Sequence, residues 1–144
     1  MHIKKLLLAA LIPVSLLAEV LHENGIFPNV KLKDQFEKEL AINAQTKQII
    51  IAFTKAQGET MKVFLEANPR YLSDNNALYI MDATEVPSVI MSMFMMPKFK
   101  KYGYSVGIVE DKQTAQTLPK QNDKLTVLSL DNLRITQIDF KESL

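Results

Sequence analysis

The sequence contains no cysteine among its 144 residues. This absence excludes a thiol nucleophile, a zinc–cysteine site and a dithiol redox pair, because each of them needs a thiolate. Histidine is almost as scarce, with two residues, and only His22 lies beyond the apolar N-terminal run. A Ser-His-Asp triad and a multi-histidine metal site are therefore not expected.

An excess of one charge sign is also missing. The chain has 17 Lys and Arg against 16 Asp and Glu, so no basic surplus marks a nucleic-acid binder. Its four glycines are scattered, and they form neither a Gly-x-Gly-x-x-Gly fingerprint nor the Gly-rich Lys-Ser/Thr loop of nucleotide hydrolases. A hydrophobic content of 47% is ample for one packed domain.

The N-terminus carries a short apolar run. Lys4 and Lys5 precede the apolar residues 6–17, and Ala18 is a small residue just before the charge of Glu19. This pattern is typical of a signal peptide, and the run is shorter than the roughly 20 residues that span a bilayer. We predict a signal peptide at 1–18, cleavage near Ala18, and an exported protein, periplasmic or secreted, without a transmembrane anchor. Residues 19–29 are predicted as an N-terminal extension and 30–144 as one domain.

Short apolar strands alternate with helical patterns through that domain. The β-branched run Ile49–Phe53 and the apolar run Ala77–Ala83 have the length and composition of buried strands. The element order predicts an α/β fold with a mixed sheet and helices on both faces. The other elements are predicted as a strand at 30–32, helices at 59–68, 88–96 (Ser88 as N-cap, broken or kinked by Pro97) and 112–118, a strand at 104–109, and a hairpin of 124–130 and 133–140 across Asp131-Asn132.

Three segments resemble the thioredoxin-like superfamily, and its redoxin-type branch in particular. Val30–Phe36 is similar to the opening strand and Asp-Gln-polar-Gly turn, with Phe36 and Glu37 in its last positions. Ile49–Phe53 is similar to the central strand, and Leu125–Ile135 to the closing hairpin. The resemblance implies a thioredoxin-like three-layer α/β/α fold with a central mixed sheet and a C-terminal β-hairpin.

The same resemblance implies that the redox site is gone. The family's two cysteines would fall within Gly58-Glu59-Thr60-Met61, and its cis-proline at Lys124-Leu125. Neither place has the required residue. The chain is therefore similar to a cysteine-free, exported relative without thiol-disulfide or peroxidase activity, and no catalytic residue is predicted.

Polar residues follow the predicted strands at their carboxyl ends. If the strands are parallel, these residues share one sheet edge, where a lysine near carboxylates and a helix N-terminus could bind an anion or position a proton. The alternative is that strand ends are polar because loops are solvated. The candidate ligand-binding edge consists of Thr54, Lys55, Gly58, Asp82 and Glu110.

A methionine-rich stretch is the other candidate. It is predicted as an interaction surface formed by Met91, Met93, Phe94, Met95 and Met96, because that helix is apolar nearly all round. Thioethers are soft ligands, so Cu(I) binding by Met91 and Met95, one helical turn apart, is an alternative. Packing of the methionines in the core is a second alternative. The lysines at the end of the helix could also contact anionic lipid.

These features favour an exported, non-redox binding or interaction module, whose partner is an unknown envelope protein or a second copy. The rival class is a small flavin-dependent (FAD/FMN) oxidoreductase or flavin-binding protein, with Thr54–Gly58 as a poor version of a phosphate loop. Methionine-based Cu(I) binding is a further alternative. No cofactor and no metal site are predicted.

Overall fold

A computed structural model describes residues 19–144 of the protein, so the predicted signal peptide lies outside the described residues. Within them, no helix is both long and apolar enough to cross a bilayer. Residues 19–29 pack onto the domain, because Phe27 is only 3% exposed and donates its backbone N–H to the Leu133 carbonyl.

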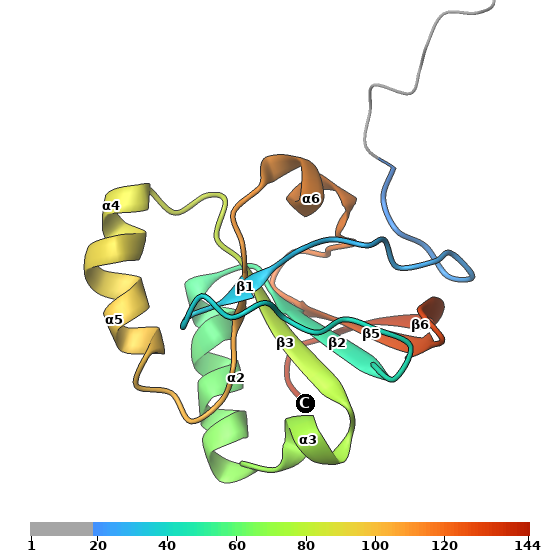
Figure 1. The fold of residues 1–144 in the computed structure, drawn as a ribbon, viewed down its shortest axis with the longest axis horizontal. Helices are drawn as coiled ribbons and strands as arrows, with labels where there is room; N and C mark the ends of the chain where they lie inside the picture. Colours follow the sequence, from blue (N-terminus) through green and yellow to red (C-terminus); the bar gives the residue numbers. More distant parts are fainter. Residues whose placement is uncertain (1–18) are drawn as a thin grey trace, which may run out of the picture.

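The described strands form one mixed sheet in the order β1-β4-β3-β2-β5-β6 (Figure 1). β2, β3 and β4 are parallel, while β1, β5 and β6 pair antiparallel at the two edges. The predicted α/β class, mixed sheet and terminal hairpin are confirmed. The strands are β1 (Lys33–Asp34), β2 (Gln48–Ala52), β3 (Ala77–Asp82), β4 (Gly107–Val109), β5 (Leu125–Asp131) and β6 (Arg134–Lys141).

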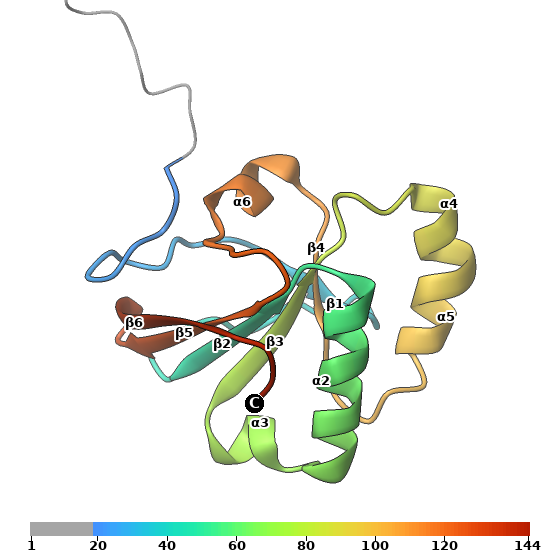
Figure 2. The ribbon, with the colours of Figure 1, turned by 180° about the vertical axis from the view of Figure 1, so that it is seen from behind.

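Helices cover the two faces of the sheet unequally (Figures 1 and 2). β2 to β3 and β3 to β4 step in the same direction, so right-handed crossovers place both connecting helices on one face. That face packs against α2, α3 and the α4–α5 helix, and the other against α6 and the N-terminal segment. The helices are α2 (Lys55–Ala67), α3 (Tyr71–Asp74), α4 (Ser88–Ile90), the π-helical η2 (Met91–Met95), α5 (Met96–Phe99) and α6 (Lys112–Thr117).

The apolar run in β2 supplies both halves of the core. Ile50 and Ala52 point into the cluster under α2, whereas Ile49 and Ile51 belong to the opposite cluster. All four are fully buried, because successive strand residues face opposite sides of a sheet that is covered on both. A continuous apolar run, rather than an alternating one, was therefore the correct signal for this strand.

The helix after β2 begins four residues before its predicted start. α2 starts at Lys55 with Thr54 as its N-cap. The Thr54 hydroxyl accepts the Gln57 N–H at 3.1 Å, and the Gln57 side chain accepts the Phe53 N–H at 2.7 Å. These bonds resemble a capping box, in which cap and third-residue side chains each satisfy a free backbone donor. Gly58 therefore lies inside the first turns of a helix and not in a glycine turn.

The methionine-rich helix also differs from its prediction. Pro87, not Ser88, is the N-cap, and the helix does not break at Pro97 but runs on to Phe99. A proline cannot donate to the carbonyl four residues earlier. The preceding turn is π-helical, with the Met96 N–H bonded to the Met91 carbonyl five residues back, and this wider turn accommodates the proline.

Three further elements differ from their predicted bounds by one to three residues. The first strand is Lys33–Asp34 and not residues 30–32. The hairpin turn is centred on Asn132 and Leu133, with φ of 51° and 68°, because Asp131 already pairs with Arg134. A two-residue turn with both central residues in the left-handed conformation has a backbone twist that matches that of the flanking strands. The predicted third strand shortens to Gly107–Val109.

Candidate functional site

The predicted ligand-binding edge exists as a sheet edge. β2, β3 and β4 are parallel and in register, with Ala52 beside Met81 and Asp82 beside Val109. The residues that follow these strands therefore come to the same end of the sheet. Their side chains, however, have separate surroundings, and the use of this edge for a ligand stays a prediction.

Thr54 and Gly58, two of the five edge residues, belong to the start of α2. Thr54 caps α2 through its hydroxyl. Gly58 lies where α2 crosses β3, and a Cβ atom added there would lie 2.7 Å from the terminal methyl carbon of Met81. That carbon is the end of a flexible side chain that could move aside, so the contact does not by itself require glycine. Gly58 lies within α2 and does not shape a phosphate loop.

Lys55 lies beside a closed crevice between α2 and α5. The hollow has a volume of about 20 Å³, which is room for one water molecule. The Lys98 ammonium bonds the Glu59 carboxylate at 2.9 Å across it. This bond lowers the pKa of Glu59 and raises the pKa of Lys98. Lys55 is exposed at the border of the crevice. Because of its small volume, the crevice itself cannot take an anion larger than water.

The two carboxylates of the edge lie apart from Lys55. The Asp82 carboxylate accepts the Thr84 N–H at 2.9 Å and the Thr84 hydroxyl at 2.6 Å, closing the turn after β3. Glu110 lines a hollow of about 830 Å³ that also contains Lys33 and Lys100. Among residues 19–144 no ion pair joins either carboxylate to Lys55.

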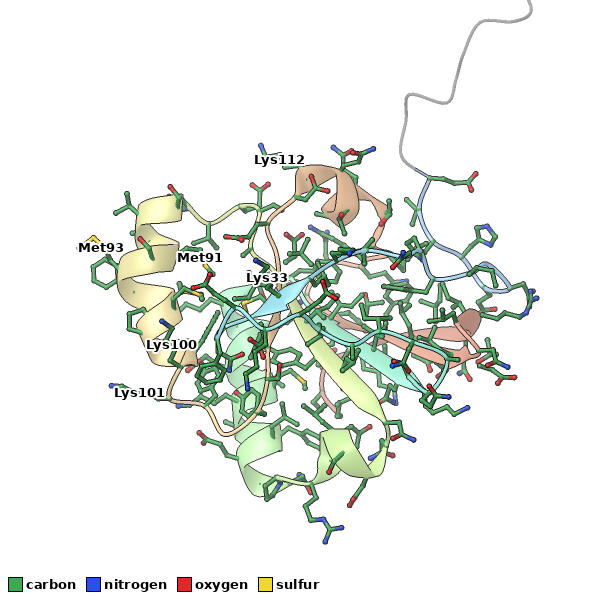
Figure 3. All side chains as sticks on the ribbon, in the orientation of Figure 1. Lys33, Met91, Met93, Lys100, Lys101 and Lys112 are labelled. Carbon is green, nitrogen blue, oxygen red and sulfur yellow. The ribbon has the colours of Figure 1, made fainter. Side chains whose placement is uncertain are left out.

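The α4–α5 helix exposes an apolar strip. Val89 and Met93 are 59% and 64% exposed, and Ile90 and Phe94 are 40% and 63% exposed. These four residues are called the apolar helix face below. Met91 on the inner side is buried, and Figure 3 shows Met93 directed away from the domain. The predicted interaction surface thus divides into an outer part with Met93 and Phe94 and an inner part with Met91, Met95 and Met96.

The two methionines considered for Cu(I) both lie in the π-helical turn η2. Met91 and Met96 line the hollow that contains Glu110. Met95 lines the crevice beside α2. Met91 and Met95 therefore border different hollows, although an α-helical spacing would place them on one face. Within the described part of the chain, no cluster of three or more His, Asp or Glu side chains could hold a metal ion.

A fully buried glutamine links β1 to the loop after α5. The Gln35 side chain donates to the carbonyls of Phe99, at 3.2 Å, and Tyr104, at 2.7 Å. It also accepts the Val106 N–H at 2.8 Å. Sequence reasoning noted the Asp-Gln turn but not this role. The turn is present as expected, with the Asp34 carboxylate accepting two backbone N–H groups and Glu37 at φ 63°, the region where glycine is favoured.

Solved structures with the same arrangement are thioredoxin-like proteins. A putative protein disulfide isomerase from Bacteroides thetaiotaomicron matches with a TM-score of 0.54 and 12% identity, over 86% of this chain and 82% of that one. A peroxiredoxin-like protein from Aquifex aeolicus matches with a TM-score of 0.53 and 8% identity, over 86% and 78%. A SCO1/SenC family lipoprotein from Bacillus anthracis matches with a TM-score of 0.52 and 8% identity, over 81% and 85%.

The protein therefore has the thioredoxin-like fold. No protein-family model matches the chain, and no curated protein is similar to it in sequence. At these identities the likeness shows the fold alone, because one fold hosts many functions. The chain has the thioredoxin-like scaffold without any cysteine, so thiol-disulfide and thiol-peroxidase chemistry by its own residues are excluded.

Proposed function

We propose that this protein is an exported, non-redox thioredoxin-like module that functions by binding another protein chain through the apolar helix face. The observation that carries the proposal is the exposure of Val89, Ile90, Met93 and Phe94 on one helix. Clustered apolar side chains on a surface are typical of protein–protein contacts. Methionine and phenylalanine are also enriched in interface cores.

Charges at the two ends of this helix favour a second copy of the chain as the partner. Glu85 precedes the helix, and Lys100 and Lys101 follow it. All three are exposed, and residues 19–144 give none of them an ion-pair partner. Two such helices packed antiparallel about a twofold axis would bring Glu85 of each chain near the lysines of the other, as an isologous interface requires.

The test is the mass of the native protein across a concentration series. Phe94→Glu places a charge in the middle of the apolar helix face and should abolish the dimer that the wild-type chain forms. Ile26→Glu is the matched control, because Ile26 is 55% exposed but lies in the N-terminal segment that pairs with β6. The control should dimerise like the wild type. A wild-type chain that stays monomeric throughout, or equal weakening by both variants, would contradict a homodimer.

The same measurement addresses export and the rival functions. Protein recovered from a periplasmic extract should lack residues 1–18. A bound flavin or copper ion would add its mass, and oxidised flavin would colour the sample. Among the described residues, the segment Thr54–Gly58 enters a helix and does not form a phosphate loop, so the structure adds no support to the flavin alternative.

A further inference from the structure

Met93 is the one methionine among residues 19–144 that is mostly exposed. Its exposed fraction is 64%, whereas that of Met91, in the same π-helical turn, is 5%. Met95 and Met96 are half-buried, and the two described methionines outside this helix are buried. Figure 3 shows the Met93 side chain directed away from the domain. A small oxidant in solution can therefore reach the Met93 sulfur more easily than any other sulfur in this part of the chain.

The chain offers an oxidant no thiol, since it contains no cysteine. Exposed cysteine thiolates react readily with peroxides, and methionine is the other side chain that such oxidants convert. In this protein an exposed thioether has no thiol to compete with it. Oxidation changes the flexible, apolar methionine into a polar sulfoxide, and methionine sulfoxide reductases can reverse the change.

Met93 also lies at the centre of the apolar helix face. The other three residues of that face lie within about one helical turn of it. In the antiparallel dimer proposed above, the two ends of the helix pair with each other, and Met93 is eight residues from both Glu85 and Lys101. The twofold axis then passes close to Met93, so that each Met93 faces its counterpart in the second copy.

We infer that Met93 is an oxidant-sensitive modification site, and that its conversion to the sulfoxide by a hydroperoxide dissociates the dimer. This inference rests on the proposed function, because it needs the apolar helix face to be the contact between two copies. The Met93 sulfur attacks one peroxide oxygen, the O–O bond breaks and a sulfur–oxygen bond forms. The sulfur loses two electrons, and the other peroxide oxygen takes up the proton and leaves as water or an alcohol. The reaction occurs on the free chain, since the dimer contact covers the sulfur.

The sulfoxide disfavours the contact because its oxygen would lose its hydrogen bonds to water there. The side chains of the apolar helix face carry no hydrogen-bond donor that could replace them. Because of the twofold symmetry, this cost arises once in each chain. The dissociation constant of the dimer should therefore rise at least about tenfold.

The test combines peroxide treatment with sedimentation. The wild-type chain is treated with hydrogen peroxide until peptide mass spectrometry finds one added oxygen atom at Met93 and none at Met91. The oxidised chain should be monomeric at concentrations at which the untreated chain is a dimer. Methionine sulfoxide reductases for both sulfoxide epimers, supplied with a dithiol, should restore the dimer. The rate of oxidation at Met93 should also fall as the protein concentration rises, because the dimer covers this residue.

Two leucine variants assign the effect to one sulfur. Met93→Leu removes the sulfur and keeps an apolar side chain of similar volume, so it should dimerise like the wild type and remain a dimer after the same treatment. Met96→Leu is the matched control, because it removes a half-buried methionine on the inner side of the helix and leaves Met93 in place. Its dimer should be lost on oxidation, as in the wild type.

The outcomes separate this inference from the proposed function. A dimer that persists when Met93 is fully oxidised would overturn this inference alone. Equal loss of the dimer in peroxide-treated Met93→Leu would also overturn it, because another residue would then be responsible. An untreated wild-type chain that is monomeric at every concentration would overturn the proposed homodimer, and this inference with it.

Discussion

At the scale of single residues, the buried Gln35 side chain makes three hydrogen bonds to backbone groups. It is fully buried and satisfies two carbonyls and one N–H of the loop that connects α5 to β4. A buried amide is tolerated only when its hydrogen bonds are made. Here those bonds hold the loop that carries Tyr102 and Tyr104.

We therefore expect Gln35→Leu to be strongly destabilising. The substitution keeps the approximate volume but removes the partner of the Tyr104 carbonyl and of the Val106 N–H. The Phe99 carbonyl still accepts the Tyr102 N–H at 3.0 Å. The free energy of unfolding should fall by about 2–4 kcal/mol. Denaturant unfolding measures this loss. Gln116→Leu, on the exposed side of α6, is the control and should change stability by less than about 0.5 kcal/mol. A loss below about 1 kcal/mol for Gln35→Leu would show that water replaces the side chain.

At the scale of elements, the start of α2 decides how Thr54 should be interpreted. Its hydroxyl caps the helix, and a cap residue contributes about 1 kcal/mol. Thr54→Ala should lower the free energy of unfolding by about that amount, and Thr54→Ser should retain most of it because the oxygen remains. Equal stability of all three chains would mean that the hydroxyl serves something other than the helix, which would renew the case for a ligand at this edge.

The strands β2, β3, β5 and β6 were predictable to within one residue or two, whereas the first strand and the helix ends were not, for physical reasons. Ile49–Ile51 are apolar and β-branched because both faces of β2 are covered, and that requirement is visible locally. The start of α2 could also be predicted from Thr54 with Gln57 three residues later. The prediction instead began the helix after Gly58. The π-helical turn could not be predicted from the sequence. It accommodates the missing N–H donor of Pro97, and another packing of the same helix could have broken it there instead.

The candidate sites show the same contrast. The outer part of the methionine-rich helix could be proposed from its composition, since apolar residues on all sides of a surface helix leave some exposed. The hydrogen bonds of Gln35 could not be predicted. Their partners are 64 to 71 residues away in the sequence, and no local pattern marks them.

At the scale of the whole molecule, the surface that we propose for binding lies away from the place at which the resemblance puts the cysteines. The apolar helix face belongs to the outer side of the α4–α5 helix, whereas that place is the start of α2.

The antiparallel dimer makes a prediction that depends on the symmetry of the entire molecule. If Glu85 meets Lys100 and Lys101 of the second copy, Glu85→Lys alone should weaken the dimer, because it creates like-charge contacts twice in a twofold interface. The double change Lys100→Glu with Lys101→Glu should weaken it similarly. Figure 3 shows both lysines at one end of the helix that carries Met93. Exposed pairs contribute about 0.2–1 kcal/mol each, and the contact occurs twice, so each variant should raise the dissociation constant about two- to thirtyfold.

Combining all three changes should restore the dimer, since the charges are then exchanged between the two ends of the helix. Sedimentation at low and high salt measures the dissociation constant of each variant's dimer. Salt should weaken the wild-type dimer and strengthen the dimers of the singly reversed chains, because screening reduces both attraction and repulsion. A parallel arrangement, or a contact that does not include the helix ends, predicts no recovery in the combined variant. Recovery would therefore establish both the surface and the orientation of the two helices, without any further structure.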